Sequence, residues 1–266
     1  PFDDYRAIPA VNQSLLKNFK HSAAMVRHRI DGGTTSSPAL EFGTAFHAAI
    51  LEPELFAKEY AVAPIADKRT KAYKEFAKEN EGRKVLSLGE SENLGMMRRQ
   101  IMEHPEAVRL LAGEGENEAT IVWNDYETGI TCKARADRLA QVDQGMVVVD
   151  LKTTVSAATR DFSQNAAKYG YHLQAAWYLR GLAAITPNSS IHAPRRFIII
   201  AVEKSAPYCV AVYELDQNAI SAGDLMVSRY LREWEKCTER DEWPAPAGVG
   251  IETLALPAWV TIGLDQ

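Results

Sequence analysis

The sequence contains few cysteines, and none of them is spaced as in a cysteine-rich site. The 266 residues include three, Cys132, Cys209 and Cys237, with no Cys-x-x-Cys pair among them. An odd number of isolated cysteines argues against a disulfide scaffold, a four-cysteine zinc site and an iron–sulfur cluster held by four cysteines of one chain. We therefore look for chemistry that does not depend on sulfur.

Long hydrophobic runs are also missing. The longest apolar stretches, 197–202 and 146–149, fall far short of the roughly 18 residues that a membrane-spanning helix needs. The first five residues, Pro-Phe-Asp-Asp-Tyr, lack the basic flank and apolar centre of a signal peptide. We therefore expect a cytoplasmic protein with no membrane partner.

The chain has no excess of positive charge. Thirty-five acidic residues outnumber 30 basic ones, which gives a net charge of −5. The field of the whole molecule therefore does not attract a polyanion, but an enzyme that acts on DNA needs carboxylates to hold cations and can keep its basic residues local. Hydrophobic residues at 46% and charged residues at 24% are ordinary for a globular protein.

The first half of the sequence is predicted to be helical. Apolar periodicity and cap residues indicate a helix that begins near Asn12 and runs past Val26, a helix at 39–51, and a helix at 91–111 that is interrupted near Pro105. The Lys-rich stretch 67–84 is typical of an exposed helix or a mobile arm.

Strands predominate from residue 119. The pattern indicates a hairpin of 119–123 and 130–139, a strand at 146–153, a long helix at 162–184, strands at 197–203 and 208–215, and a helix from Asp216 to about Cys237. This order predicts an α/β fold in which helices flank a mixed central β-sheet. We expect a single domain over 1–266, with a helical part at about 1–115, a catalytic part at about 116–240 and a tail at 241–266.

Two aspartates are predicted to meet where adjacent strands end. Asp150 and Lys152 are two residues apart in one strand, so their side chains project to the same face. Asp137 closes the preceding strand, and a turn at Gly145 folds the two strand ends together. Hard divalent ions bind carboxylate oxygens, and a nearby lysine can neutralise developing charge. The alternative is a plain surface Asp–Lys pair at a strand end.

At this point the motifs resemble a known superfamily. Asp137, the segment 147–154 (Val-Val-Val-Asp-Leu-Lys-Thr-Thr) and the Gln174-x-x-x-Tyr178 pair on a helix resemble the PD-(D/E)xK nucleases, although Ala136 stands where the superfamily name has proline. The segments 42–47, 51–53 and 241–244 are similar to the nuclease domain of RecE-type exonucleases (exonuclease VIII). The resemblance extends from about residue 5 to 259.

The resemblance implies a restriction-endonuclease-like core and a set of metal ligands. Asp137, Asp150, His47 and the Leu151 carbonyl would bind Mg²⁺, for which Mn²⁺ can substitute, and Lys152 would be the catalytic lysine. Without the resemblance, His47 on its apolar helix is typical of a core histidine with satisfied nitrogens.

The resemblance also assigns residues around this centre. Gln174 and Tyr178 lie one helical turn apart and would face the DNA, and Glu118 matches an acidic position of the catalytic set. Candidate DNA contacts are Lys133 and Arg135 on the strand of Asp137, His172 beside the Gln-x-x-x-Tyr pair, and Ser14, Lys17 and Arg27 on the first helix, where related enzymes grip a terminal phosphate. Local packing of Tyr178 and simple solvation of the basic residues remain alternatives.

The resemblance implies an Mg²⁺-dependent exonuclease that digests the 5′-ended strand of linear double-stranded DNA and leaves 3′ single-stranded DNA for recombination by strand annealing. Expected partners are linear duplex ends and a single-strand annealing protein of the RecT type, and the expected assembly is a closed ring, a tetramer by resemblance. Two other interpretations are a Cas4-like or AddB-like nuclease, which the cysteine count disfavours, and a nuclease-fold DNA-binding module that has lost activity.

Overall fold

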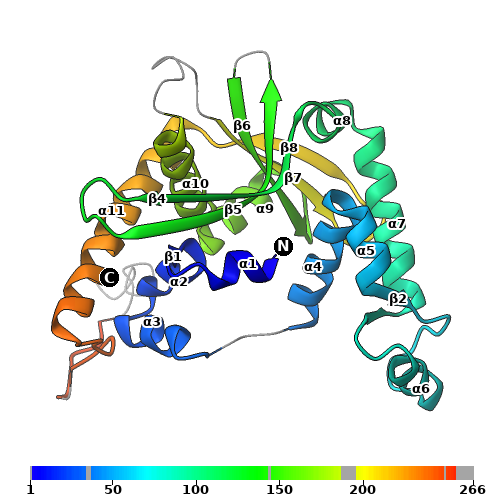
Figure 1. The fold of residues 1–266 in the computed structure, drawn as a ribbon, viewed down its shortest axis with the longest axis horizontal. Coiled ribbons are helices and arrows are strands. Elements are labelled where there is room, and N and C mark those ends of the chain that lie inside the picture. Colours follow the sequence, from blue (N-terminus) through cyan, green and yellow to red (C-terminus); the bar gives the residue numbers. More distant parts are fainter. Residues whose placement is uncertain (1, 34–36, 143–144, 187–195, 249, 256–266) are drawn as a thin grey trace, which may run out of the picture.

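The computed structural model describes residues 2–33, 37–142, 145–186, 196–248 and 250–255 (Figure 1). The helices are α1 Phe2–Ala7, α2 Gln13–Leu16, the 3₁₀ helix η1 Lys17–Lys20, α3 Ala23–Ile30, α4 Pro38–Leu51, α5 Pro53–Glu59, α6 Lys71–Glu79, α7 Leu88–Glu103, α8 Pro105–Ala112, α9 Thr159–Tyr169, α10 Tyr171–Ile185 and α11 Gln217–Arg240. The strands are β1 Val11–Asn12, β2 Tyr60–Val62, β3 Lys84–Leu86, β4 Gly115–Asn124, β5 Thr131–Val142, β6 Gly145–Thr154, β7 Arg196–Glu203 and β8 Val210–Glu214.

The main sheet is mixed, as predicted. Its strands follow the order β1-β5-β6-β7-β8, and β4 pairs with the other edge of β5. The pairs β4–β5, β5–β6 and β7–β8 are antiparallel, whereas β1–β5 and β6–β7 are parallel. A separate two-stranded parallel sheet joins β2 and β3. The predicted fold class is confirmed.

Helices cover both faces of the sheet, which explains the continuous apolar run in β6. Val148 packs in the core that α2, α3, α10 and α11 form on one face. Val147, Val149 and Leu151 pack in the core that α4, α7 and α8 form on the other. Because strand side chains alternate between faces, a strand buried on both sides reads as an unbroken hydrophobic segment.

Two predicted helices are each interrupted. Asn12 caps α2 as expected, since its Oδ1 accepts from the Leu15 amide at 2.9 Å, but a 3₁₀ turn follows and Ser22 caps a new helix, α3. The predicted helix 162–184 breaks at Gly170, whose φ of 74° ends α9 in a left-handed conformation that glycine adopts without a Cβ penalty. α10 then begins at Tyr171.

Other predictions hold in outline. The helix at 39–51 is α4, the interruption at Pro105 separates α7 from α8, and Asp216 caps α11 through the Ala219 amide at 2.7 Å. The Lys-rich stretch contains α6, which is anchored by the buried Tyr73. The predicted turn before Gly145 and part of the predicted tail at 241–266 lie outside the described residues. Among those described, no helix has both the length and the hydrophobicity to span a bilayer.

Candidate active site

The candidate site lies where one edge of β5 is left unpaired. β4 occupies the opposite edge from Thr131 to Ala140, so β1 and β6 share the remaining one. β1 pairs with residues 132 and 133, and β6 pairs with residues 138 to 142. Residues 134–137 therefore form an open fork between β1 and β6, where backbone groups need partners other than a strand.

Asp137 and Asp150 meet at this fork. The last β5–β6 pair is Arg138 with Val149, and one step further the same register brings Asp137 opposite Asp150. Instead of another ladder bond, Asp137 Oδ2 accepts a hydrogen bond from the Leu151 amide at 2.7 Å. The two carboxylates meet, as predicted, but they lie inside β5 and β6 at the point where the strands diverge, and not at the strand ends.

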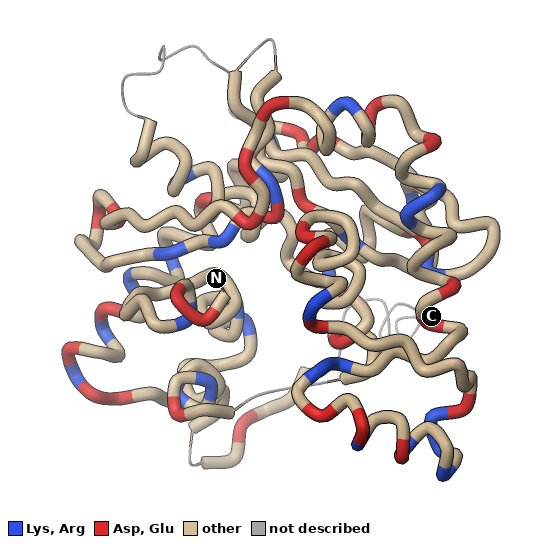
Figure 2. Tube along the Cα trace, turned by 45° about the vertical axis from the view of Figure 1, so that its right-hand side comes forward, with Lys and Arg blue, Asp and Glu red and all other residues tan. Residues whose placement is uncertain are grey.

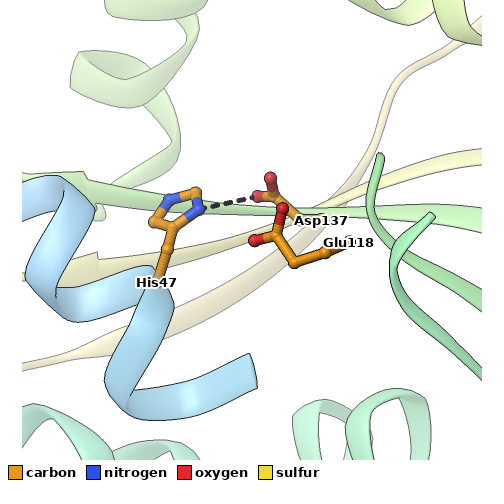
Figure 3. A group of neighbouring side chains, drawn as sticks. All are labelled: His47, Glu118 and Asp137. Carbon is orange, nitrogen blue, oxygen red and sulfur yellow. Dashed lines mark ion pairs between the residues drawn. The ribbon is translucent and has the colours of Figure 1, made fainter. Parts of the chain in front are cut away.

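Asp137 is also joined to the helix α4 on the far side of the cleft (Figure 3). His47 Nδ1 lies 3.3 Å from Asp137 Oδ2. Glu118 of β4, which has a positive φ of 53°, projects toward the same point, and one ligand atom from each of these three residues lies within 4.8 Å of the others. Nitrogen from an imidazole and oxygen from two carboxylates form a donor set that suits Mg²⁺ or Mn²⁺.

Asp150 faces a different pair of side chains. Its Oδ2 forms an ion pair with the Lys152 ammonium, and its Oδ1 accepts a hydrogen bond from Gln174 Nε2 at 2.7 Å. The side chain of Asp150 is only 4% exposed, so these contacts hold a buried charge that needs compensation. Gln174 thus orients a carboxylate, whereas its expected place facing the DNA stays a prediction.

Tyr178 forms a hydrogen bond with the backbone of the open edge of β5. Its hydroxyl donates to the Arg135 carbonyl at 2.8 Å, and Trp177, one residue earlier, donates from its indole to the Lys133 carbonyl at 3.0 Å. The guanidinium of Arg135 pairs with Glu118 at 2.6 Å and lies 3.8 Å from Glu52. Side chains of α10 therefore supply hydrogen bonds that a neighbouring strand would otherwise supply along the fork.

Burial and neighbouring charges act differently on the two aspartates. Burial raises the pKa of Asp150 to about 6, against the influence of Lys152. For Asp137 the effect of burial is outweighed by the charge and hydrogen bond of His47, so its pKa falls below the ordinary value. The pKa of Lys152 is raised because Asp150 and Asp137 outweigh the burial that would lower it. Opposite charges thus stabilise one another at the fork.

Most of the predicted catalytic residues line one cleft. Its lining includes His47, Glu118, Asp137, Leu151, Lys152 and Tyr178. Helix α1, which the sequence did not predict, runs along this cleft and contributes Phe2 and Tyr5 to its lining. Arg29 and Glu52 also line it; they were not predicted, because a single basic or acidic residue on a helix carries no motif.

Two predicted DNA contacts on β5 are engaged within the protein. The Lys133 ammonium is buried and donates to the backbone carbonyls of Tyr5, Arg6 and Ile8, which tie α1 to the sheet. These three hydrogen bonds engage the Lys133 ammonium within the protein although the residue also lines the cleft, and its phosphate contact stays a prediction. Arg135, only 10% exposed, pairs with Glu118 and also lines the cleft. The alternation of side chains along the strand predicted the face on which Lys133 and Arg135 lie. It did not predict that α1 covers that face.

The remaining predicted contacts are spread over several elements. His172 packs between α10 and α11, with Nε2 3.1 Å from Met226 Sδ, and its DNA contact stays a prediction. Arg27 pairs with Asp31 on α3 and does not line the cleft. Ser14 lines the cleft, and Lys17 lies close enough to Lys152 for their charges to interact, which together with burial lowers the pKa of Lys17.

This fold and this site define a PD-(D/E)xK nuclease fold. The chain belongs to the family described as "PDDEXK-like domain of unknown function (DUF3799)", whose model matches residues 12–253. The superfamily resemblance in the sequence is thereby confirmed.

Solved structures share the architecture. The chain is similar to a protein named "Putative exonuclease" from Eubacterium rectale, with a TM-score of 0.59 and 14% identity over 96% of this chain and 93% of that one. It also matches an alkaline exonuclease from Laribacter hongkongensis with a TM-score of 0.28 and 12% identity, over 74% and 97% of the two chains. No curated protein matches the sequence. At 14% identity the first similarity shows the fold alone.

The open edge yields a prediction about Tyr178. In Tyr178→Phe the Arg135 carbonyl loses its donor within the fork, so we expect the free energy of unfolding to fall by about 1–3 kcal/mol in urea denaturation. Tyr126→Phe is the matched control: this tyrosine is 79% exposed, and its change should stay within about 0.5 kcal/mol. Equal stability of the two variants would show that the fork does not depend on the Tyr178 hydroxyl.

Proposed function

We propose that the protein is an Mg²⁺-dependent DNA exonuclease that hydrolyses phosphodiester bonds from the 5′ ends of linear duplex and leaves 3′ single strands. The observation that carries this proposal is the convergence of His47, Asp137, Asp150 and Lys152 on the open edge of β5, within a PD-(D/E)xK fold. A helix and two strands bring these side chains together around the lysine. A plain surface Asp–Lys pair would not need residues from three elements.

The donor atoms at the fork fit a hard divalent ion. His47 and Asp137 would hold it together with Glu118, which the geometry places beside them, and with Asp150 and the Leu151 carbonyl, which the resemblance implies. When bound, such an ion polarises the scissile phosphate and lowers the pKa of a coordinated water. Mn²⁺ should substitute for Mg²⁺, since an imidazole nitrogen suits it well.

The protein's own side chains have separate roles in this proposal. In this proposal the Lys152 ammonium stabilises the negative charge that grows on the phosphate as the water oxygen bonds to phosphorus and the ester oxygen leaves. Gln174 fixes the direction of Asp150, and Tyr178 fixes the backbone at Arg135. These two are positioning residues in the structure, rather than groups that contact the reacting atoms.

The proposal extends to the biological setting that the RecE resemblance implies. We infer an enzyme of the cytoplasm that works with a RecT-type annealing protein and assembles as a closed ring of four copies around DNA, since enclosure would keep a protein of net negative charge on its substrate. The Cas4-like or AddB-like alternative is less well supported: Cys132 and Cys237 are buried, and the described residues contain no metal-ligand group that includes a cysteine.

The direct test is digestion of linear duplex labelled separately at the 5′ and 3′ ends. In Mg²⁺ or Mn²⁺ we expect early release of the 5′ label as mononucleotide, while the 3′ label stays on a long single strand. In Ca²⁺ we expect binding of DNA ends without digestion, because the larger, less strictly octahedral ion positions the attacking water poorly.

Asp150→Asn is the control for this test, because it keeps the size of the side chain and removes its charge. It should abolish release of either label while the variant still unfolds cooperatively. Cleavage that persists in EDTA, or near-native activity in Asp150→Asn, would refute the proposed function. A folded protein that binds DNA ends but never cleaves them would instead support the inactive binding module.

Lys152 separates catalysis from metal binding. Lys152→Ala should lose about 10²-fold or more in cleavage rate, since an ammonium that stabilises transition-state charge is removed, yet it should still bind Mn²⁺ in calorimetric titration because it supplies no ligand atom. Lys71→Ala, which alters an exposed lysine paired with Glu75 on α6, should leave the rate unchanged. A native cleavage rate in Lys152→Ala would show that Lys152 is only a structural partner of Asp150.

A further inference from the structure

The tyrosines on either side of the helix break at Gly170 lie next to the candidate site. Tyr171 opens α10, and the Lys152 ammonium lies 5.2 Å from the centre of its ring. Tyr169 closes α9, and its ring stacks on that of Tyr171 with centroids 6.1 Å apart and an interplanar angle of 28°. The pair therefore leads from the candidate catalytic lysine to the protein surface.

The outer ring is open to solvent, whereas the inner ring is fixed from behind. Tyr169 is 54% exposed. Tyr171 is half-buried and contacts the buried Phe162, whose centroid lies 6.0 Å away and which itself stacks on Tyr213. An exposed aromatic ring supported by a rigid one presents a flat apolar face at little entropic cost, which is the form of surface on which an unpaired base stacks.

Among the described residues, Lys168 and Lys20, on the outer side of this pair, have no carboxylate partner, unlike Lys152 on its inner side, which pairs with Asp150. The Lys168 ammonium lies 5.5 Å from the Tyr169 ring centre, and Lys20 donates to the Lys168 carbonyl at 3.1 Å. No ion pair joins Lys17, Lys20 or Lys168 to any carboxylate in the described part of the chain, whereas Lys68, Lys71 and Lys84 each have one. Lysines without carboxylate partners beside a solvent-exposed aromatic ring are complementary to the phosphates and bases of a nucleic-acid strand.

We propose that Tyr169 and Tyr171, with Lys20 and Lys168, form a binding surface for unpaired nucleotides of a DNA single strand that adjoin the bond to be cut. The inference rests on the proposed nuclease function and extends it to strand recognition. A single strand is the occupant that fits, because bases inside a duplex are stacked on both faces, whereas successive unpaired bases can each place a ring face on an aromatic side chain.

The test is fluorescence anisotropy of a labelled 15-nucleotide thymidine oligomer in EDTA, which prevents cleavage. Tyr169→Ala should weaken binding about tenfold or more, the range expected for loss of one base–aromatic stack, while Tyr169→Phe should stay within about twofold of the native protein. Tyr126→Ala is the control, since Tyr126 is also highly exposed but lies on the β4–β5 turn, where it contacts Arg180. A 15-base-pair duplex should lose much less affinity than the single strand.

The lysines are tested by salt dependence. Lys20→Ala and Lys168→Ala should each reduce the slope of log affinity against log salt concentration by about 0.7, the value for one phosphate contact on a single strand. Native affinity in Tyr169→Ala, equal losses for single strand and duplex, or no binding of the oligomer by the native protein would each overturn the proposal.

The outcomes also separate this inference from the proposed function. Cleavage of linear duplex in Mg²⁺ together with single-strand binding that does not depend on Tyr169 would refute only the binding surface. Single-strand binding that depends on Tyr169, without cleavage in Mg²⁺ or Mn²⁺, would refute the nuclease proposal and leave the binding surface in place.

Discussion

The structure of the site depends on the unpaired edge of β5 between β1 and β6. A buried strand edge must satisfy its backbone groups, and here the partners are the side chains of Trp177 and Tyr178 from α10 and a carboxylate contact to the Leu151 amide. Because no strand fills the gap, β5 and β6 diverge beyond Arg138 and Val149, so that Asp137 faces a cleft and the buried Asp150 lies beside it against Lys152 and Gln174. The two strands pair only beyond this point, from Arg138 with Val149 to Val142 with Gly145.

Charge is balanced pair by pair around this gap rather than over the whole surface. His47 faces Asp137, Lys152 faces Asp150 and Arg135 faces Glu118, so each carboxylate has one cation at hand. Elsewhere acidic and basic residues are interleaved along the chain, as Figure 2 shows. A net charge of −5 is therefore compatible with local cationic groups, and the lysines near Tyr169 are such a group.

Sequence reasoning predicted the features that short-range rules determine. The caps at Asn12 and Asp216, the doubly covered valine strand and the meeting of Asp137 with Asp150 all follow from local patterns. Tertiary contacts decided the rest. Lys133 is buried only because α1 folds over β5, and no periodicity in 2–7 predicts that helix. Gly170 could have been recognised as a helix end, since glycine followed by a new apolar stripe is a common terminator.

The central claim is that the fork between β1 and β6 holds a divalent ion. Anomalous diffraction from crystals grown with Mn²⁺ measures this directly. The structure predicts a single strong anomalous peak within about 2.0–2.4 Å of His47 Nδ1 or Nε2 and of an Asp137 carboxylate oxygen, lost in Asp137→Asn crystals grown in the same way. Native crystals with no peak at the fork, or with a peak that persists in Asp137→Asn, would contradict it.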